Sequence, residues 1–234
     1  ILDSGRNRPE RFASTHDVEG QKVTLADYVS RMKPEQKSIY FVTADTLAAA
    51  KNSPHLEGFS AKGFEVLLLT DRIDEWLTSH LPEFDGKKLE SVARAAKDIE
   101  SAIETPEKAA NESAYKDTLE RIKKALAGKI SEAKLSARLT ESPACLVAAE
   151  YGMSLRMERM MKAAGQASPF GGGQPVFEIN AEHPLVQRLK ELADDTAFAD
   201  LAGLLHDQAV LAEGGQLEDP ASFVKRLNKL ILDG

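Results

Sequence analysis

The clearest pattern of apolar positions lies near the end of the chain, in Thr196–Leu232. Apolar residues recur there every three or four positions, which predicts two amphipathic helices. Gly214 and Gly215 favour the end of the first helix, and Asp219 with Pro220 favours the start of the second. The predicted apolar stripes are formed by Phe198, Leu201, Leu204, Leu205, Phe223, Leu227, Leu230 and Ile231.

This helix pair could bury its apolar stripes in two ways. It could pack against the core of its own domain, or it could meet a second copy of itself and form a four-helix bundle. We expect the second arrangement, because nothing that follows these helices in the sequence could cover them. The eight apolar residues are therefore predicted dimerisation residues, in an interface of about 1,600 Å².

Two earlier segments have the pattern of buried strands. Ser38–Thr43 and Phe64–Leu69 are short, nearly continuous apolar runs rich in β-branched and aromatic residues. The segments between them are helical in pattern, so we expect the two strands to pair in parallel. Further along, the alternating residues 129–139 and the apolar residues 144–149 predict a pair of partner strands, with a third strand at Val176–Ile179.

The composition changes between Lys97 and Lys116, where the chain is charged, contains Pro106 and has few large apolar residues. We place a domain boundary near Thr105, giving domains 1–105 and 106–234. The sequence thus predicts a mixed α/β and α+β protein. A small α/β part is followed by an α+β domain with a three-stranded sheet and the helix pair that forms the dimeric bundle.

The chain has 234 residues and a net charge of −7, with a pI near 5.4. An acidic protein is a poor partner for nucleic acid or an anionic membrane surface. No apolar run approaches the roughly 20 residues that span a bilayer. Cys145 is the single cysteine, which fits a reducing, cytoplasmic setting. Because the sequence begins at Ile1, we expect a fragment of a longer protein.

No residue set in the sequence predicts catalysis or metal binding. Gly171–Gly173 lacks the Lys-Ser/Thr of a phosphate-binding loop and follows a helical segment, so a flexible linker is favoured. The five histidines show no metal-ligand spacing. Asp71, Asp74 and Glu75 form a dense acidic group, which at a helix start complements the helix dipole.

Two features leave their roles open. Met153, Met157, Met160 and Met161 share one face of a predicted helix, and such a face forms either core or an adaptable binding surface. The adjoining glycine loop favours exposure of that face. Trp76 lies near Ile73, Leu77 and His80 on another predicted helix, and its spacing alone favours core over a binding hot spot.

The chain also resembles the heat-shock protein 90 chaperones, in particular the bacterial HtpG type. The resemblance runs in family order through nearly the whole chain. The segments that carry it most clearly are Ser38–Thr43 (SIYFVT), Lys51–Glu57 (KNSPHLE), Phe64–Trp76 (FEVLLLTDRIDEW), Glu83–Lys87 (EFDGK), Met157–Ala163 (MERMMKA) and Leu217–Pro220 (LEDP).

This resemblance implies the end of a middle domain followed by a C-terminal dimerisation domain. ATP and Mg would bind to an N-terminal domain that lies outside this chain. The chain itself would then need no cofactor and would not be an enzyme, although its parent would be an ATP-driven stress-response chaperone. The implied partners are a second copy, non-native client proteins and a bacterial co-chaperone. The implied client-binding residues are Ile73, Trp76, Leu77, Met153, Met157, Met160 and Met161.

Two rival functions remain open at this stage. The chain could be a purely structural dimerisation module with no client surface. It could also be a small-molecule α/β enzyme built on residues 38–90, with polar groups around Asp45 and Asp71 at the ends of the two buried strands.

Overall fold

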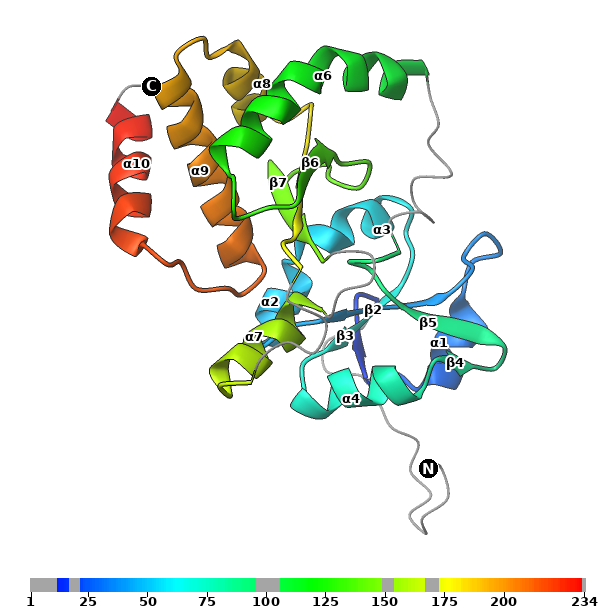
Figure 1. Ribbon diagram of the computed structural model, residues 1–234. Helices are drawn as coiled ribbons and strands as arrows, with labels where there is room; N and C mark the ends of the chain where they lie inside the picture. The colour runs from blue at the N-terminus through cyan, green and yellow to red at the C-terminus, as the bar shows by residue number, and fades with distance from the viewer. Residues whose placement is uncertain (1–11, 17–21, 96–105, 149–153, 167–172, 233–234) are drawn as a thin grey trace.

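The protein is described by a computed structural model that covers residues 12–16, 22–95, 106–148, 154–166 and 173–232 (Figure 1). The fold is mixed α/β with two sheets, one built from residues before position 95 and one from residues after 130. The predicted boundary near Thr105 lies outside the described residues, and so does Met153.

The first sheet has a parallel centre and short antiparallel edges. The parallel pairing of β2 with β3 confirms the strands predicted from the two apolar runs, and β5 pairs in parallel on the other side of β2. The two edge strands contain only two residues each, too few for a sequence period, and were not predicted. In sheet order the strands are β1 (Ala13–Ser14), β3 (Val66–Leu69), β2 (Ile39–Thr43), β5 (Lys87–Ser91) and β4 (Glu83–Phe84).

Side chains from both faces of this sheet are buried. Tyr40 and Val42 of β2 pack in one apolar cluster, and Ile39 and Phe41 pack in another on the opposite face. The helices of this part are α1 (Leu25–Arg31), α2 (Leu47–Lys51), the 3-10 turn η1 (Pro54–Leu56), α3 (Glu57–Ala61) and α4 (Arg72–His80).

The second sheet has three strands, β6 (Glu132–Leu135), β7 (Ala144–Val147) and β8 (Val176–Ile179), in the order β6-β8-β7. The central strand β8 is parallel to β6 and antiparallel to β7. The prediction that residues 129–139 and 144–149 pair directly is therefore wrong. Strand β8 lies between them instead. The middle strand of a small sheet is the best covered, and Phe177 and Ile179 of β8 are fully buried.

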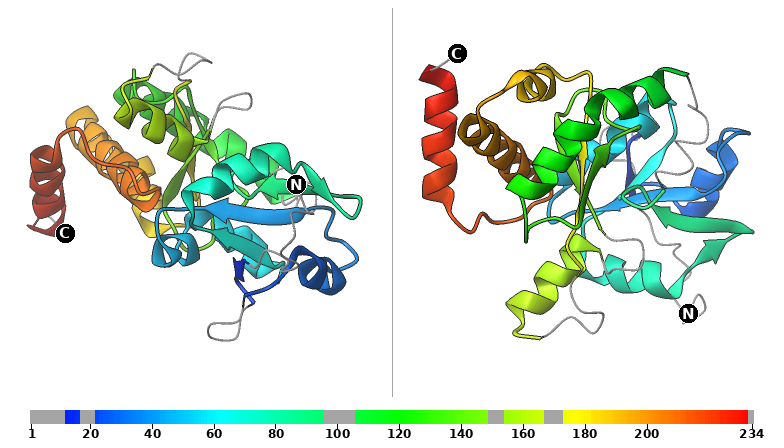
Figure 2. Two further views of the ribbon diagram at one scale, coloured as in Figure 1. Left: turned by 90° about the horizontal axis from the view of Figure 1, so that it is seen from below. Right: turned by 45° about the horizontal axis from the view of Figure 1, so that its top comes forward.

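Helices α6, α8 and α9 pack around this sheet and share its apolar core. Helix α10 contacts α9 and lies on the outer side of it in all three views (Figures 1 and 2). Helix α7 lies apart from this bundle (Figure 1), and Ser154 at its start contacts Glu75 of α4. The bounds are α6 (Pro106–Ala125), α7 (Leu155–Ala163), α8 (Pro184–Glu191), α9 (Asp195–Ala212) and α10 (Pro220–Leu232).

Among the residues that the structure describes, no helix has the length and apolarity needed to cross a membrane.

Candidate functional site

Helix α4 exposes two large apolar side chains. The Ile73 side chain is 65% exposed and the Trp76 side chain is 50% exposed, while Leu77 is half-buried. The Trp76 ring stacks on the His80 ring with 4.1 Å between centroids, and His80 Nδ1 lies 2.8 Å from the carbonyl oxygen of Trp76. Trp76 is therefore a surface residue and not the core residue that its spacing favoured. An exposed tryptophan next to an exposed isoleucine is a candidate contact for another protein.

Helix α7 carries the methionines. Met157, Met160 and Met161 are half-buried, while Met153 lies outside the described residues. The neighbouring Glu158 is half-buried too, and this burial raises the pKa of its carboxyl. The methionine face is neither core nor fully exposed. Half-covered methionines suit an adaptable contact surface.

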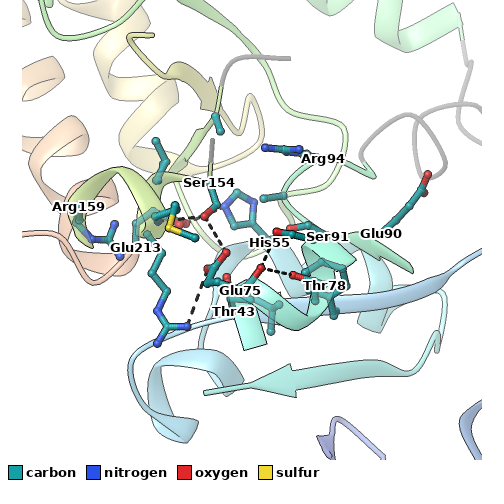
Figure 3. A pocket seen from close by; sticks show the side chains of 18 of the residues that line it. Thr43, His55, Glu75, Thr78, Glu90, Ser91, Arg94, Ser154, Arg159 and Glu213 are labelled. Carbon is teal, nitrogen blue, oxygen red and sulfur yellow. Dashed lines mark hydrogen bonds and ion pairs between the residues drawn. The ribbon is translucent and has the colours of Figure 1, made fainter. Parts of the chain in front are cut away.

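The two helices are joined by charged and polar side chains. Glu75 of α4 and Arg156 of α7 are both buried, and an Arg156 nitrogen lies 4.0 Å from a Glu75 oxygen. Ser154 donates a hydrogen bond to the second Glu75 oxygen at 3.2 Å, and Arg156 Nε donates to Asp45 at 3.0 Å. Figure 3 shows Ser154 and Glu75 pointing toward each other. The structure thus brings the predicted tryptophan and methionine segments together.

A cavity of about 660 Å³ lies next to this contact. Apolar side chains from Phe41, Leu89, Leu146 and Met157 line it together with polar ones. Figure 3 shows Arg94, Glu90 and Arg159 around it, with His55 and Glu213 near its base. Its wall is built from both parts of the chain, so its shape depends on how the two sheets are joined.

Hydrogen bonds to one carboxylate and a histidine–glutamate contact help to make that junction. Three consecutive backbone N–H groups, from Thr140, Glu141 and Ser142, donate to the Glu57 carboxylate at 2.6 to 3.1 Å. Burial favours the neutral acid, but these hydrogen bonds outweigh it and hold the pKa of Glu57 below its ordinary value. His55 Nε2 lies 2.8 Å from Glu213 at the end of α9. These contacts could not be predicted from sequence patterns, because each joins residues far apart in the chain.

The predicted dimerisation residues fall into two groups. Those of α9, namely Phe198, Leu201, Leu204 and Leu205, lie in the core of the single chain. Those of α10, namely Phe223, Leu227 and Leu230, are half-buried against the same core, and Ile231 is 67% exposed. Val224 and Leu232 are also exposed. In the single chain most of the α9 stripe is therefore covered, and the exposed large apolar residues of the helix pair are Leu211 near the end of α9 and Val224, Ile231 and Leu232 of α10.

The carboxylates proposed for an enzyme site have structural partners. Asp45 pairs with Arg156, and Asp71 is the N-cap of α4, where its N–H donates to Asp74 at 2.8 Å. In the described part of the chain, no cluster of histidine, cysteine or acidic side chains has the arrangement of a metal site.

Comparison with known proteins gives consistent matches. A family model described as Hsp90 protein matches residues 10–234. The chain is 57% identical over 227 residues to the chaperone protein HtpG of Chromobacterium violaceum, covering 95% of this chain and 36% of that protein. It is 57% identical over 225 residues to HtpG of Methylococcus capsulatus and 58% identical over 225 residues to HtpG of Burkholderia lata, covering 35% of each. The chain thus spans about a third of the length of these curated relatives.

Proposed function

Because the chain belongs to the Hsp90 protein family, we propose that it serves a molecular chaperone by binding non-native polypeptides and by pairing with a second copy of itself. The names of its relatives support the chaperone role. Since the chain spans about a third of those relatives, an ATP-driven cycle, a co-chaperone and a cytoplasmic location belong to the proposal for the whole protein.

The client-binding surface consists of the exposed residues of α4 and the methionine face of α7. The observation that carries this assignment is the exposure of Trp76, at 50%, on a helix that contacts α7 through Glu75 and Ser154. An aromatic anchor gives large contact area, and methionines adapt to different side chains. The combination suits weak binding of many unfolded sequences.

This assignment can be tested with Trp76→Ser and Met157→Ser. Each should weaken binding to a permanently unfolded client, such as reduced and carboxymethylated α-lactalbumin, by about tenfold. Thermal unfolding should change little, because neither side chain is fully buried. Leu47→Ser is the control, since Leu47 is an exposed apolar residue on α2. If Leu47→Ser weakened client binding equally, affinity would depend on exposed apolar residues in general and not on this surface.

Pairing of two copies through α10 adds to client binding. Val224 near the start of α10, and Ile231 and Leu232 at its end, are exposed apolar residues on a helix that already rests on α9. Two linked copies offer two client surfaces, so weak contacts combine into tighter binding. A purely structural dimerisation module would not need the exposed Trp76. The enzyme alternative is disfavoured because Asp45 and Asp71 serve structural contacts.

A further inference from the structure

Arg156 is an unusual residue for an amphipathic helix at the protein surface. It lies in α7 between half-buried neighbours, yet only 6% of its surface is exposed. A buried guanidinium needs partners for its charge and its N–H groups. Arg156 finds most of them in the first part of the chain. Its Nε donates to Asp45 at 3.0 Å and its Nη2 to the Thr70 carbonyl oxygen at 3.4 Å. Its Nη1 makes no hydrogen bond within the described residues and faces a Glu75 oxygen across 4.0 Å as an ion pair.

Ser154 fixes the start of the same helix to the same carboxylate. Its hydroxyl donates to Glu75 at 3.2 Å, and its oxygen accepts the backbone N–H of Met157 at 3.1 Å. Ser154 thus acts in the first turn of α7 as capping residues do. Glu75 is 7% exposed, so its charge depends on Arg156 for compensation.

Each of the two charged residues is the sequence neighbour of a residue of the proposed client-binding surface. Glu75 directly precedes Trp76, and Arg156 directly precedes Met157. A contact between Glu75 and Arg156 therefore sets how the tryptophan lies relative to the methionine face. We propose that Arg156 is a positioning residue that clamps α7 against α4, so that the two helices present one continuous surface to a non-native polypeptide. This inference rests on the proposed client-binding function.

Arginine suits this position better than lysine. Its planar guanidinium contacts Asp45, Thr70 and Glu75 at once, which a lysine ammonium on a flexible stem could not do with the same geometry. Loss of one partner of a buried ion pair leaves the other charge uncompensated. Without Arg156, α7 should therefore separate from α4, because the carboxylate of Glu75 gains by reaching water.

The first measurement is a distance between the two parts joined by the clamp. Spin labels are placed on cysteines introduced at the exposed positions Lys51, at the end of α2, and Gln166, just beyond α7. Burial raises the pKa of the Cys145 thiol well above its ordinary value, so this thiol should not react. With Arg156 in place, the distances between the two labels should be narrowly distributed. In Arg156→Ala the distribution should be broad. Arg159→Ala removes the same charge elsewhere on α7 and should leave the distribution narrow.

The second measurement is binding of carboxymethylated α-lactalbumin in a double-mutant cycle. Arg156→Ala should weaken binding on the order of tenfold, because only one helix then contacts each segment of the client. In the Arg156→Ala protein, adding Met157→Ser should not weaken client binding any further. Adding Trp76→Ser should weaken it by the same factor as in the unmodified protein. If Arg156 only stabilised the fold, Arg156→Ala would change the effects of Met157→Ser and Trp76→Ser alike.

A second variant separates loss of the clamp from misfolding of Arg156→Ala. Glu75→Gln keeps the side-chain shape and an acceptor for Ser154 but removes the charge that Arg156 faces, and it should broaden the distances in the same way. A narrow distribution in both variants, with Met157→Ser still effective, overturns the clamp. If Trp76→Ser and Met157→Ser have no effect in the unmodified protein, the proposed function fails, while the distance measurement still decides the clamp.

Discussion

Arg138 and Glu178 form a two-pronged ion pair in which Nε and Nη2 of the arginine each lie 3.0 Å from a carboxylate oxygen. Both side chains are almost fully buried, at 2% and 1% exposed. Arg138 also donates to the carbonyl oxygen of Val92, just beyond β5, at 2.9 Å. Since Glu178 lies in β8, one arginine joins the second sheet to the first.

Arg138→Ala should lower the free energy of unfolding by about 3–5 kcal/mol, because the Glu178 carboxylate is left buried without its counter-ion. Urea unfolding followed by circular dichroism measures this loss. Lys134→Ala is the matched control: Lys134 is 3.8 Å from the same carboxylate but is 46% exposed, so its loss should stay below ~1 kcal/mol. Equal losses from the two substitutions would contradict the central role of Arg138.

Gly58→Ala should also weaken the junction between the sheets. A Cβ at Gly58 would lie 3.1 Å from the Cα and carbonyl oxygen of Arg138, and backbone atoms cannot move aside easily. We expect a loss of roughly 1–3 kcal/mol in unfolding free energy. At Gly203, in the middle of α9, a Cβ would meet only the end of the Arg226 side chain at 3.3 Å. Gly203→Ala should therefore cost less or even stabilise α9, since alanine is the better helix former.

The stability of the protein should fall as the solution becomes acidic. Burial lowers the pKa of His206 from its ordinary value of 6.5, although a hydrogen bond with Asp207 opposes part of this shift. The unfolded chain therefore takes up this proton at a higher pH than the folded chain. The stabilisation is complete above pH 6.5 and declines as the pH falls below it. Unfolding free energies at several pH values should show a shallower decline in His206→Gln than in the unmodified protein.

Ile231→Asp combined with Leu232→Asp should turn a dimer into a monomer at low micromolar concentration, as measured by sedimentation or light scattering. Both side chains are exposed on α10, at 67% and 84%, so the charges should not unfold the single chain. Asn228→Asp adds one negative charge at another exposed position of α10 and should leave the mass unchanged. A mass that stays dimeric in the double variant would exclude the end of α10 from the interface.

The regular elements were predictable where apolar residues repeat over several turns or fill a whole strand. The strands at Ser38–Thr43 and Phe64–Leu69 and the two closing helices follow such patterns. The order of strands in a sheet was harder to predict. Alternation of apolar and polar residues indicates a strand, but it does not indicate which strand pairs with it. For that reason the place of β8 between β6 and β7 was missed.

The candidate surface was half predictable. The resemblance to chaperones pointed to Trp76 and the methionines, whereas the spacing of Trp76 alone favoured core. The pairing of Arg156 with Asp45 could not be read from the sequence, because 111 positions separate the two residues and charged residues usually lie on the surface. Glu75 was interpreted as part of an acidic helix start, whereas the structure buries it against α7.

The central strand of the second sheet is also the last of its three strands to leave the ribosome. While a nascent chain ends before Val176, β6 and β7 have been made but lack the strand that pairs with both. Loops that close over such separations form slowly. The sheet, and the packing of α9 on β7 that depends on it, should therefore assemble only after most of this domain has been translated. Until then the edges of β6 and β7 that face β8 are left unpaired.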